Sequence, residues 1–241
     1  MIFALLASIW QLLATFNLYN KGIIPPPSQD FNAVINLWKQ GTLWSDFVAS
    51  MGRYVPGFMI GGVAGIISGI ITGTIPECGD AINPLFHYLR SIPSVALVPF
   101  MLVLFGLGNA GKIILVAWAC MFPVWLNTQT GIRRVPREYI QASQVFGIKG
   151  LRRVIQVWLP CALPHILSGL RIAVSTGLFA LAAVEMFAGS SGIGFRIMYS
   201  YQLFQTNAMV GMTLFLGFIA LIAELLLSVI SSYILRWDNN V

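Results

Sequence analysis

The sequence contains few charged residues. Only 9% of its 241 residues are charged, with 14 Lys and Arg against 8 Asp and Glu, whereas soluble domains average about 25%. Hydrophobic residues make up 57%, and the mean hydropathy is +0.80. So few charges cannot cover a water-exposed surface, which excludes an ordinary soluble enzyme, a disordered chain and a secreted disulfide scaffold. A polytopic membrane protein remains, with residues 1–241 predicted as a single transmembrane domain.

Cysteine and histidine are also scarce. The three cysteines, Cys78, Cys120 and Cys161, lack the spacing of metal ligands, and we interpret them as apolar fillers. There are only two histidines, and neither H-E-x-x-H nor G-x-S-x-G occurs. A metal centre is therefore not expected. A membrane-embedded enzyme would have to rely on a site built from unpaired polar groups.

A further absence concerns nucleotide binding. Residues 106–112, GLGNAGK, fit the pattern G-x-x-x-x-G-K, but Ile113 stands where a phosphate-binding loop needs Ser or Thr to hold magnesium. The segment also joins two predicted spans. We therefore expect no ATP hydrolysis by this chain alone, and no cofactor in it.

Long stretches without charge predict the membrane spans. A helix that crosses the hydrocarbon core needs about 20 apolar residues, and helices are the form that satisfies backbone groups in lipid. The sequence therefore predicts an all-α polytopic membrane protein with about six transmembrane helices. These helices are expected at 1–20, 54–76, 91–111, 113–132, 154–170 with 172–184, and 197–223 with 225–235.

Basic residues predict the orientation of the spans. The connection between the fourth and fifth spans is strongly basic, and such loops remain in the cytoplasm. With six spans, both termini and the loop at 77–90 are then cytoplasmic, while the loops at 21–45, 107–112 and 187–207 face outward. The basic residues of the connection are Arg133, Arg134, Arg137, Lys149, Arg152 and Arg153, against Glu138 alone.

Residues 21–48 form an unusual segment before the second span. The stretch KGIIPPPSQD, residues 21–30, predicts a stiff extended chain because three successive prolines cannot lie inside a helix. Residues 31–48 alternate apolar and polar residues at helical spacing, which predicts short amphipathic helices at the outer membrane interface.

Five glycines recur at every fourth position of the second span, from Gly57 to Gly73. Small residues at this spacing form one ridge that allows two helix backbones to approach closely. The ridge indicates either tight packing within one subunit, or a dimer contact or the wall of a substrate path.

Two ionisable residues, Arg171 and Glu224, interrupt predicted spans, and a third, Glu185, directly follows one. Arg171 is close enough to the cytoplasmic side to extend its charge there. Glu185 is predicted near the outer end of its helix, as a helix-capping or interfacial carboxylate or as a pathway residue. Glu224 is nearer the middle of the membrane, where we expect an interhelical bond.

The cytoplasmic connection at 133–160 contains a docking element. Residues 137–146 lack Pro and Gly and predict a short helix, which Gly147 terminates, and a second short helix is predicted at 149–158 before Leu159-Pro160. Tyr139 and Phe146 share one side of the first helix. An apolar face on a basic loop indicates a surface that docks onto a partner.

The same segment resembles the coupling loop of the permeases of bacterial ABC importers. That loop has E-A-A, three residues, Gly, nine residues, Ile, any residue and Leu-Pro. Counting from Gly147 places Gln141-Ala142-Ser143 and Val157 at the matching positions, with Leu159-Pro160 at the end. Gln141, Ser143 and Val157 depart from the pattern, and Glu138 one turn earlier offers the charge that position 141 lacks.

Three further stretches extend this resemblance to the nitrate, sulfonate and taurine branch of these permeases. They are IIPPPSQD, LRSIPSVALVPFMLVLFGLG at 89–108, and VEMFAGSSGIGF at 184–195. The resemblance implies a type I permease fold in the bacterial inner membrane. It also implies the transmembrane subunit of an importer for a small anionic solute of the nitrate, bicarbonate, sulfonate or taurine class.

The resemblance further implies the partners. Two cytoplasmic ATPase subunits would bind ATP and Mg and hydrolyse the ATP, a second permease copy would complete the pore as a homodimer, and an extracytoplasmic solute-binding protein would deliver the solute. Membrane lipid surrounds the chain, and no nucleic acid is expected. The coupling residues implied are Glu138, Tyr139, Gln141, Ala142, Ser143, Gly147, Leu159 and Pro160.

Polar residues on the spans are candidates for the translocation path. Prolines at 93 and 99 free backbone groups in the third span, which suits a helix that lines a cavity. The alternative is a secondary transporter or channel that works without ATPases and relies on Glu185 and Glu224. The candidates for the path are Ser68, Thr72, Ser94, Ser175, Thr176 and Glu185.

Overall fold

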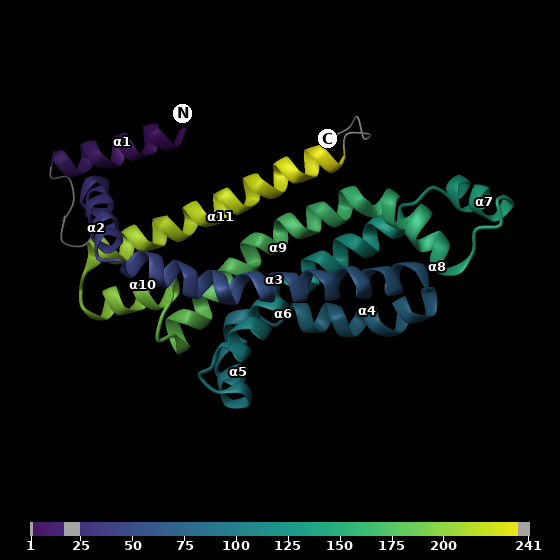
Figure 1. Cartoon of the computed structure of the whole chain (residues 1–241), viewed down its shortest axis with the longest axis horizontal. Coiled ribbons are helices and arrows are strands. Elements are labelled where there is room, and N and C mark those ends of the chain that lie inside the picture. Colours follow the sequence, from purple (N-terminus) through teal and green to yellow (C-terminus); the bar gives the residue numbers. More distant parts are fainter. Residues whose placement is uncertain (1, 17–24, 236–241) are drawn as a thin grey trace. The chain divides into compact units, whose positions relative to one another are not determined.

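The computed structural model describes residues 2–16 and 25–235, and every regular element in these ranges is helical (Figure 1). The predicted all-α class is therefore confirmed. The helices are α1 (Ile2–Thr15), α2 (Pro27–Lys39), α3 (Thr42–Thr74), α4 (Pro76–Arg90), η1 (Ser94–Leu97), α5 (Val98–Phe105), α6 (Asn109–Arg133), α7 (Arg137–Val145), α8 (Gly150–Arg153), η2 (Val154–Trp158), α9 (Leu159–Ala188), α10 (Ile193–Gln202) and α11 (Thr206–Ile234).

Contacts divide the chain into two compact units. The first unit comprises Met1–Gly52 and Leu181–Leu221, and the second comprises Arg53–Ala180 and Ile222–Val241. Helices α3, α9 and α11 each contribute residues to both units. The assignment of residues 1–241 to one transmembrane domain stays a prediction.

Four helical stretches in the described part of the chain are long and apolar enough to cross a membrane. They are α3, α6, the continuous run Gly150–Ala188, and α11, and the bent pair of α4 with Ser94–Phe105 would be a fifth. The predicted first span comprises α1, which the structure describes, and residues 17–20, which lie outside the described residues. Lys21, predicted in the loop after this span, also lies outside them. The count of six spans therefore stays a prediction.

The third predicted span, 91–111, is wrong as a single straight helix. The loop expected at 77–90 is the helix α4, and the chain then bends by 84° before Ser94–Phe105. Pro93 lies at the bend and provides no backbone N–H for a continuing helix. Gly106, with φ of +68°, ends α5, and residues 109–111 already belong to α6.

The segment before the second span also differs from its prediction in part. Residues 27–39 form the amphipathic helix α2, which starts with Pro27 after the extended Pro26. Residues 42–48, by contrast, are the first turns of α3 rather than a short helix of their own. Trp38 of α2 and Trp44 of α3 meet edge to face, with 6.2 Å between ring centroids.

The glycine ridge of α3 packs against α6 within the same chain. A Cβ added at Gly65 would lie 2.6 Å from the Met121 carbonyl oxygen, and one added at Gly69 would lie 2.5 Å from Thr128 Cβ. Of the two interpretations, packing inside one subunit is therefore confirmed. The residues that face the ridge, in chain order, are Val116, Ala117, Met121, Thr128 and Ile132.

Two predictions about charged residues are wrong. Lys112, expected in an outward-facing loop, belongs to the first turn of α6 and is buried, with 2% of its surface exposed. Glu224, expected to form an interhelical bond, is exposed on α11 and makes no hydrogen bond or ion pair within residues 2–16 and 25–235. Charge position along a sequence does not reveal which face of a helix is covered.

Candidate functional site

Helix α7 is the centre of the predicted coupling loop. It spans Arg137–Val145, which confirms the helix expected at 137–146 to within one residue. Pro136, with φ of −57° and ψ of 139°, sets the extended chain that precedes the first turn. Glu138 in that turn is favourable because the N-terminus of a helix carries partial positive charge.

Gly147 ends α7 in the manner predicted. Its φ is +70°, a left-handed conformation that side chains with a Cβ disfavour. The N–H of Ile148 donates to the Ser143 carbonyl at 2.8 Å, and the N–H of Gly147 donates to the Gln144 carbonyl at 3.0 Å. These two bonds constitute a Schellman motif, which closes the helix and reverses the chain.

The outer surface of α7 exposes apolar side chains. Val145 is 86% exposed, Phe146 is 80% exposed, and Tyr139 and Leu151 are also open to solvent. Glu138, Gln141 and Ala142 are exposed beside them. Ser143 differs, because it is buried and its hydroxyl donates to the Ile140 carbonyl at 2.6 Å. An exposed cluster of large apolar residues beside charged ones is typical of a protein interface.

The short helix predicted at 149–158 is not separate from the fifth span, which is a correction to the prediction. The helix is continuous from Gly150 to Ala188, and η2 (Val154–Trp158) is a π-helical turn within it. The Leu159 N–H donates to the Val154 carbonyl five residues earlier. Pro160 has no N–H and its ring collides with the carbonyl four residues back, so a wider turn before it relieves the conflict.

A cavity of about 330 Å³ lies where α7 meets the start of α9. Tyr139 of α7 and Pro160 of α9 both line it, so the structure brings two of the predicted coupling residues together. His165 and Arg134 contribute polar groups to the same wall. A Cβ at Gly131 would lie 2.8 Å from the Cβ of His165, so α6 and α9 are in close contact here.

A second cavity, of about 390 Å³, lies at the bend after α4. Ser94 and Thr176, two of the predicted path residues, both line it. Arg90 and Ser91 line it as well and were missed by sequence reasoning. The prediction that the Ile92-Pro93-Ser94 break lines a cavity is confirmed. A guanidinium and several hydroxyls around one space are suited to a small anion.

The other polar candidates of the second unit lie outside this cavity. The Ser68 hydroxyl donates to its own helix at the Ala64 carbonyl, and Ser175 is exposed on α9. Thr72 is buried, and its hydroxyl accepts from Trp125 Nε1 at 3.0 Å. Its carbonyl accepts from Gln129 and Arg133, so Thr72 joins α3 to α6.

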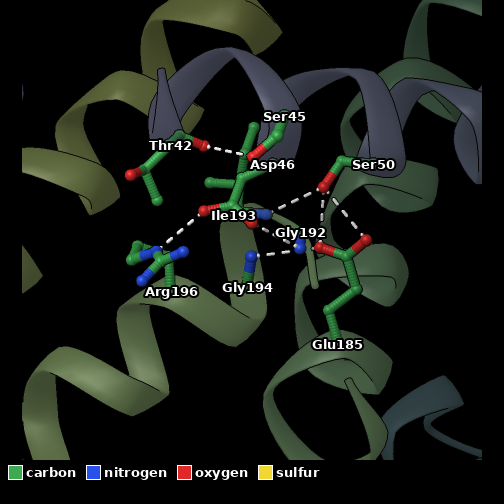
Figure 2. A network of polar contacts seen from close by, with 9 residues as sticks. All are labelled: Thr42, Ser45, Asp46, Ser50, Glu185, Gly192, Ile193, Gly194 and Arg196. Atoms are coloured by element: carbon green, nitrogen blue, oxygen red, sulfur yellow. Dashed lines mark hydrogen bonds and ion pairs between the residues drawn. The ribbon is translucent and has the colours of Figure 1, made fainter. Parts of the chain in front are cut away.

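Glu185 lies in the first unit, in a buried polar network (Figure 2). Its carboxylate accepts from the Ser50 hydroxyl at 2.8 Å and from the Gly194 N–H at 3.0 Å. Ser50 in turn accepts from the Ile193 N–H at 2.9 Å. Glu185 therefore caps the start of α10, which agrees with the capping alternative stated for it.

Asp46 completes the same network (Figure 2). It accepts from the Gly192 N–H at 3.0 Å and from Arg196 Nε at 2.7 Å. Three successive backbone N–H groups before and in the first turn of α10 thus each have a side-chain acceptor. Gly192 has φ of +117°, and a Cβ there would overlap the Glu185 carboxylate. The S-G-I-G stretch seen in the sequence is therefore a capped turn.

Sequence reasoning missed Asp46 and Ser50, the partners of this turn. Both lie on α3 at a spacing of one helical turn, but nothing local indicates that they face residues 185–196. No group of three or more His, Cys, Asp or Glu placed to hold a metal ion occurs among the residues that the structure describes.

Comparison with known proteins identifies the relatives of this arrangement. Residues 57–237 match the family model described as "Binding-protein-dependent transport system inner membrane component". The taurine transport system permease TauC of Escherichia coli is 29% identical over 99% of this chain and 88% of its own length. The nitrate import permease NrtB of Leptolyngbya laminosa is 27% identical over 95% of this chain and 84% of its own.

One of the similar solved structures is an inward-facing conformation of the MetNI methionine ABC transporter. The TM-score is 0.63 with 19% sequence identity, and the match covers 80% of this chain and 94% of the other. At this identity the match supports the fold.

Proposed function

Because the chain belongs to the family of inner membrane components of binding-protein-dependent transport systems, we propose that it forms the translocation path for a small anion. The chain is the permease of an ABC importer. TauC and NrtB are named for taurine and nitrate, and another relative is a bicarbonate transport system permease. These names indicate a sulfonate, nitrate or bicarbonate class of solute here.

The observation that carries the anion proposal is the cavity at the bend after α4. Arg90 provides a fixed positive charge, and Ser94 and Thr176, which bear hydroxyls, line the same cavity. A planar guanidinium binds the oxygens of a nitrate, carboxylate or sulfonate group with two parallel hydrogen bonds. Thr72 would support this region indirectly, because it joins α3 to α6, whereas Ser68, Ser175 and Glu185 stay predicted path residues.

The coupling proposal rests on α7. The exposed apolar residues Tyr139, Val145 and Phe146 would dock onto a cytoplasmic ATPase subunit. A movement of that subunit would shift α7 and, because Tyr139 and Pro160 line one cavity, would reach the start of α9 there. The Gly147 turn keeps the docking helix short and rigid. ATP, Mg and hydrolysis would then belong to the ATPase subunits, with this chain as a non-catalytic partner.

The assembly proposed is two copies of this chain, two ATPase subunits and an extracytoplasmic solute-binding protein. In this arrangement α7 and both termini face the cytoplasm, as the basic connection at 133–153 favours. An ion-coupled secondary transporter is the less favoured function, because the Glu185 carboxylate is enclosed by Ser50 and the α10 turn rather than open to a path.

Site-specific crosslinking tests the coupling proposal. A photoreactive phenylalanine analogue replaces Phe146 in the intact complex purified from its native membrane, and the products are identified by mass spectrometry. Phe204, 90% exposed in the turn before α11, is the matched control. We expect a crosslink to a nucleotide-binding subunit from position 146 and none from position 204. Equal crosslinking from both positions, or none from 146, contradicts the proposal.

Uptake measurements test the anion path. Arg90→Gln removes the charge from the cavity, and we expect uptake of the anion to fall about tenfold or more, which corresponds to loss of one charge-assisted hydrogen bond. Arg90→Lys keeps the charge and should retain part of the uptake. Lys39→Gln, an exposed charge change on α2, is the control. Unchanged uptake in Arg90→Gln contradicts a role for this cavity.

A further inference from the structure

The first unit contains a cavity of about 490 Å³ between α2, the start of α3 and α11. This volume lies within the range of about 300–1,000 Å³ that small-molecule sites occupy. We name it the Asp30 cavity, because Asp30 is the single ionisable residue among those that line it. The remaining residues are apolar or glycine, namely Pro27, Phe31, Val34, Ile35, Trp38, Leu43, Gly211, Leu214, Phe215 and Phe218.

Asp30 lines this cavity and is buried without a partner among the described residues. The residue is 1% exposed, and neither carboxylate oxygen accepts a hydrogen bond from any residue that the structure describes. Burial raises the pKa of Asp30 to about 6. The carboxyl group is therefore ionised near neutral pH, and a buried charge of this kind is costly unless a cation accompanies it.

Packing holds the backbone of Asp30 in place. A Cβ added at Gly211 of α11 would lie 2.8 Å from the Asp30 carbonyl oxygen and 2.8 Å from Val34 Cγ2. The helices α2 and α11 are thus in direct contact at the residue that bears the charge. Asp30 also lies in the first turn of α2, so its backbone is fixed by helical geometry.

Four aromatic side chains line the same cavity: Phe31, Trp38, Phe215 and Phe218. The faces of aromatic rings attract cations, and sites for organic ammonium ions combine such faces with a carboxylate. We propose that the Asp30 cavity binds a small hydrophobic ammonium ion, whose charged nitrogen pairs with Asp30 and whose apolar body contacts the aromatic rings.

The lining excludes other occupants on chemical grounds. An anion would meet the Asp30 charge with no Lys, Arg or His among the described residues that line the cavity. A zwitterionic aminophospholipid brings an ammonium group, but its phosphate would find no cation in the lining. A divalent metal ion needs about six oxygen ligands, and this cavity offers one carboxylate. A free amine with an apolar body leaves no charge unpaired.

This site is independent of the proposed translocation path. The Asp30 cavity belongs to the first unit, whereas Arg90, Ser94 and Thr176 belong to the second. The charge preference is also opposite, because the Asp30 cavity selects cations. Failure of the test below leaves the anion path unaffected.

Equilibrium dialysis of the intact complex tests the proposal. The probes are benzyltrimethylammonium, whose charge does not vary with pH, and neopentylbenzene, its neutral isostere. We expect the cation to bind about tenfold more tightly than the isostere near pH 7.5, because one paired charge distinguishes them. We expect about tenfold weaker cation binding near pH 5, because Asp30 is then mostly protonated, whereas the isostere changes little.

Variants separate the ionic contact from general apolar binding. Asp30→Asn should weaken cation binding about tenfold, to the affinity of the isostere, because it removes the paired charge. Asp80→Asn, which removes an exposed carboxylate of α4 outside the cavity, should leave both affinities unchanged. Val34→Trp fills the cavity and should weaken both probes, which keeps the test informative if Asp30→Asn alters folding. Equal binding by Asp30→Asn and the unaltered chain overturns the proposal.

Two further measurements test the source of the cation. In nanodiscs, displacement of the probe by phosphatidylethanolamine but not by phosphatidylglycerol would assign the cavity to a lipid headgroup and overturn the proposal of a free amine. Lys21, outside the described residues, is examined with Lys21→Met. Tighter probe binding in that variant would identify Lys21 as the occupant and overturn it too. We expect neither result.

Discussion

Replacing Ser50 by alanine should destabilise the first unit strongly. The Ser50 hydroxyl donates to Glu185, at 2.8 Å from Oε2, and accepts from the Ile193 N–H at 2.9 Å. Alanine removes both interactions from a buried site, since Ser50 has no exposed surface. The Ile193 N–H is then left without that acceptor, and the Glu185 carboxylate loses one donor.

The magnitude follows from these two losses. A buried backbone donor without a partner costs about 1–3 kcal/mol, and a hydrogen bond to a charged group contributes about 1.5–3 kcal/mol. The two terms are coupled, so we expect about 3–5 kcal/mol in total. For a chain of this size, each kcal/mol lowers the melting temperature by about 2–4 °C, so a decrease of about 10 °C is expected.

The assay is thermal unfolding of the purified protein in detergent at a fixed scan rate. Ser45→Ala is the matched control, because Ser45 lies on the same helix but is exposed and bonds only to the Thr42 carbonyl. Its effect should stay within about 0.5 kcal/mol. Equal shifts for Ser45→Ala and Ser50→Ala would refute the reasoning. So would strict additivity of Ser50→Ala with Glu185→Gln, because directly bonded residues should couple by about 0.5–3 kcal/mol.

Three further predictions concern the second unit and α11. Gly65→Ala should lower the melting temperature by several degrees because its Cβ meets a carbonyl of α6, whereas Gly217→Ala, in open space on α11, should stabilise by up to about 1 kcal/mol. Gly147→Ala should cost about 1–2 kcal/mol and reduce solute-stimulated ATPase activity of the complex, whereas Gly147→Asn should retain more activity. Thr72→Val should cost about 1–3 kcal/mol in thermal unfolding, and Thr74→Val, which loses a bond within its own helix only, clearly less.

Features that depend on local pattern were predictable from the sequence. The apolar runs at 54–74, 113–132 and 206–234 lie in helices because lipid leaves no other way to satisfy the backbone. The span predicted from 197 is wrong in its first part, because the chain leaves the helix at 203–205, between α10 and α11. The end of α7 was predictable because a Schellman turn requires a residue that tolerates a positive φ, and Gly147 follows the helix directly. The glycine ridge was predictable as a packing surface, since its period of four residues matches one helix face.

Features that depend on two distant segments were not predictable. The bend at Pro93 was recognisable as a break, but its angle of 84° depends on what α4 and α5 pack against. The sequence predicted a separate short helix at 149–158 before Leu159-Pro160, yet the chain continues through a π-helical turn at Val154–Trp158 into α9. Arg90 joined the candidate cavity only through that bend.

The three buried carboxylates of the first unit show how the partner decides the role. Asp46 and Glu185 are neutralised by donors that the chain provides, namely Arg196, Ser50 and the N–H groups at the start of α10. Their burial therefore strengthens a turn. Asp30 is equally buried, but within the described residues no donor faces it. The fold therefore satisfies two of these groups with its own donors and leaves the third, beside an apolar cavity, without a donor among the described residues, which is the position that the proposed ammonium ligand would fill.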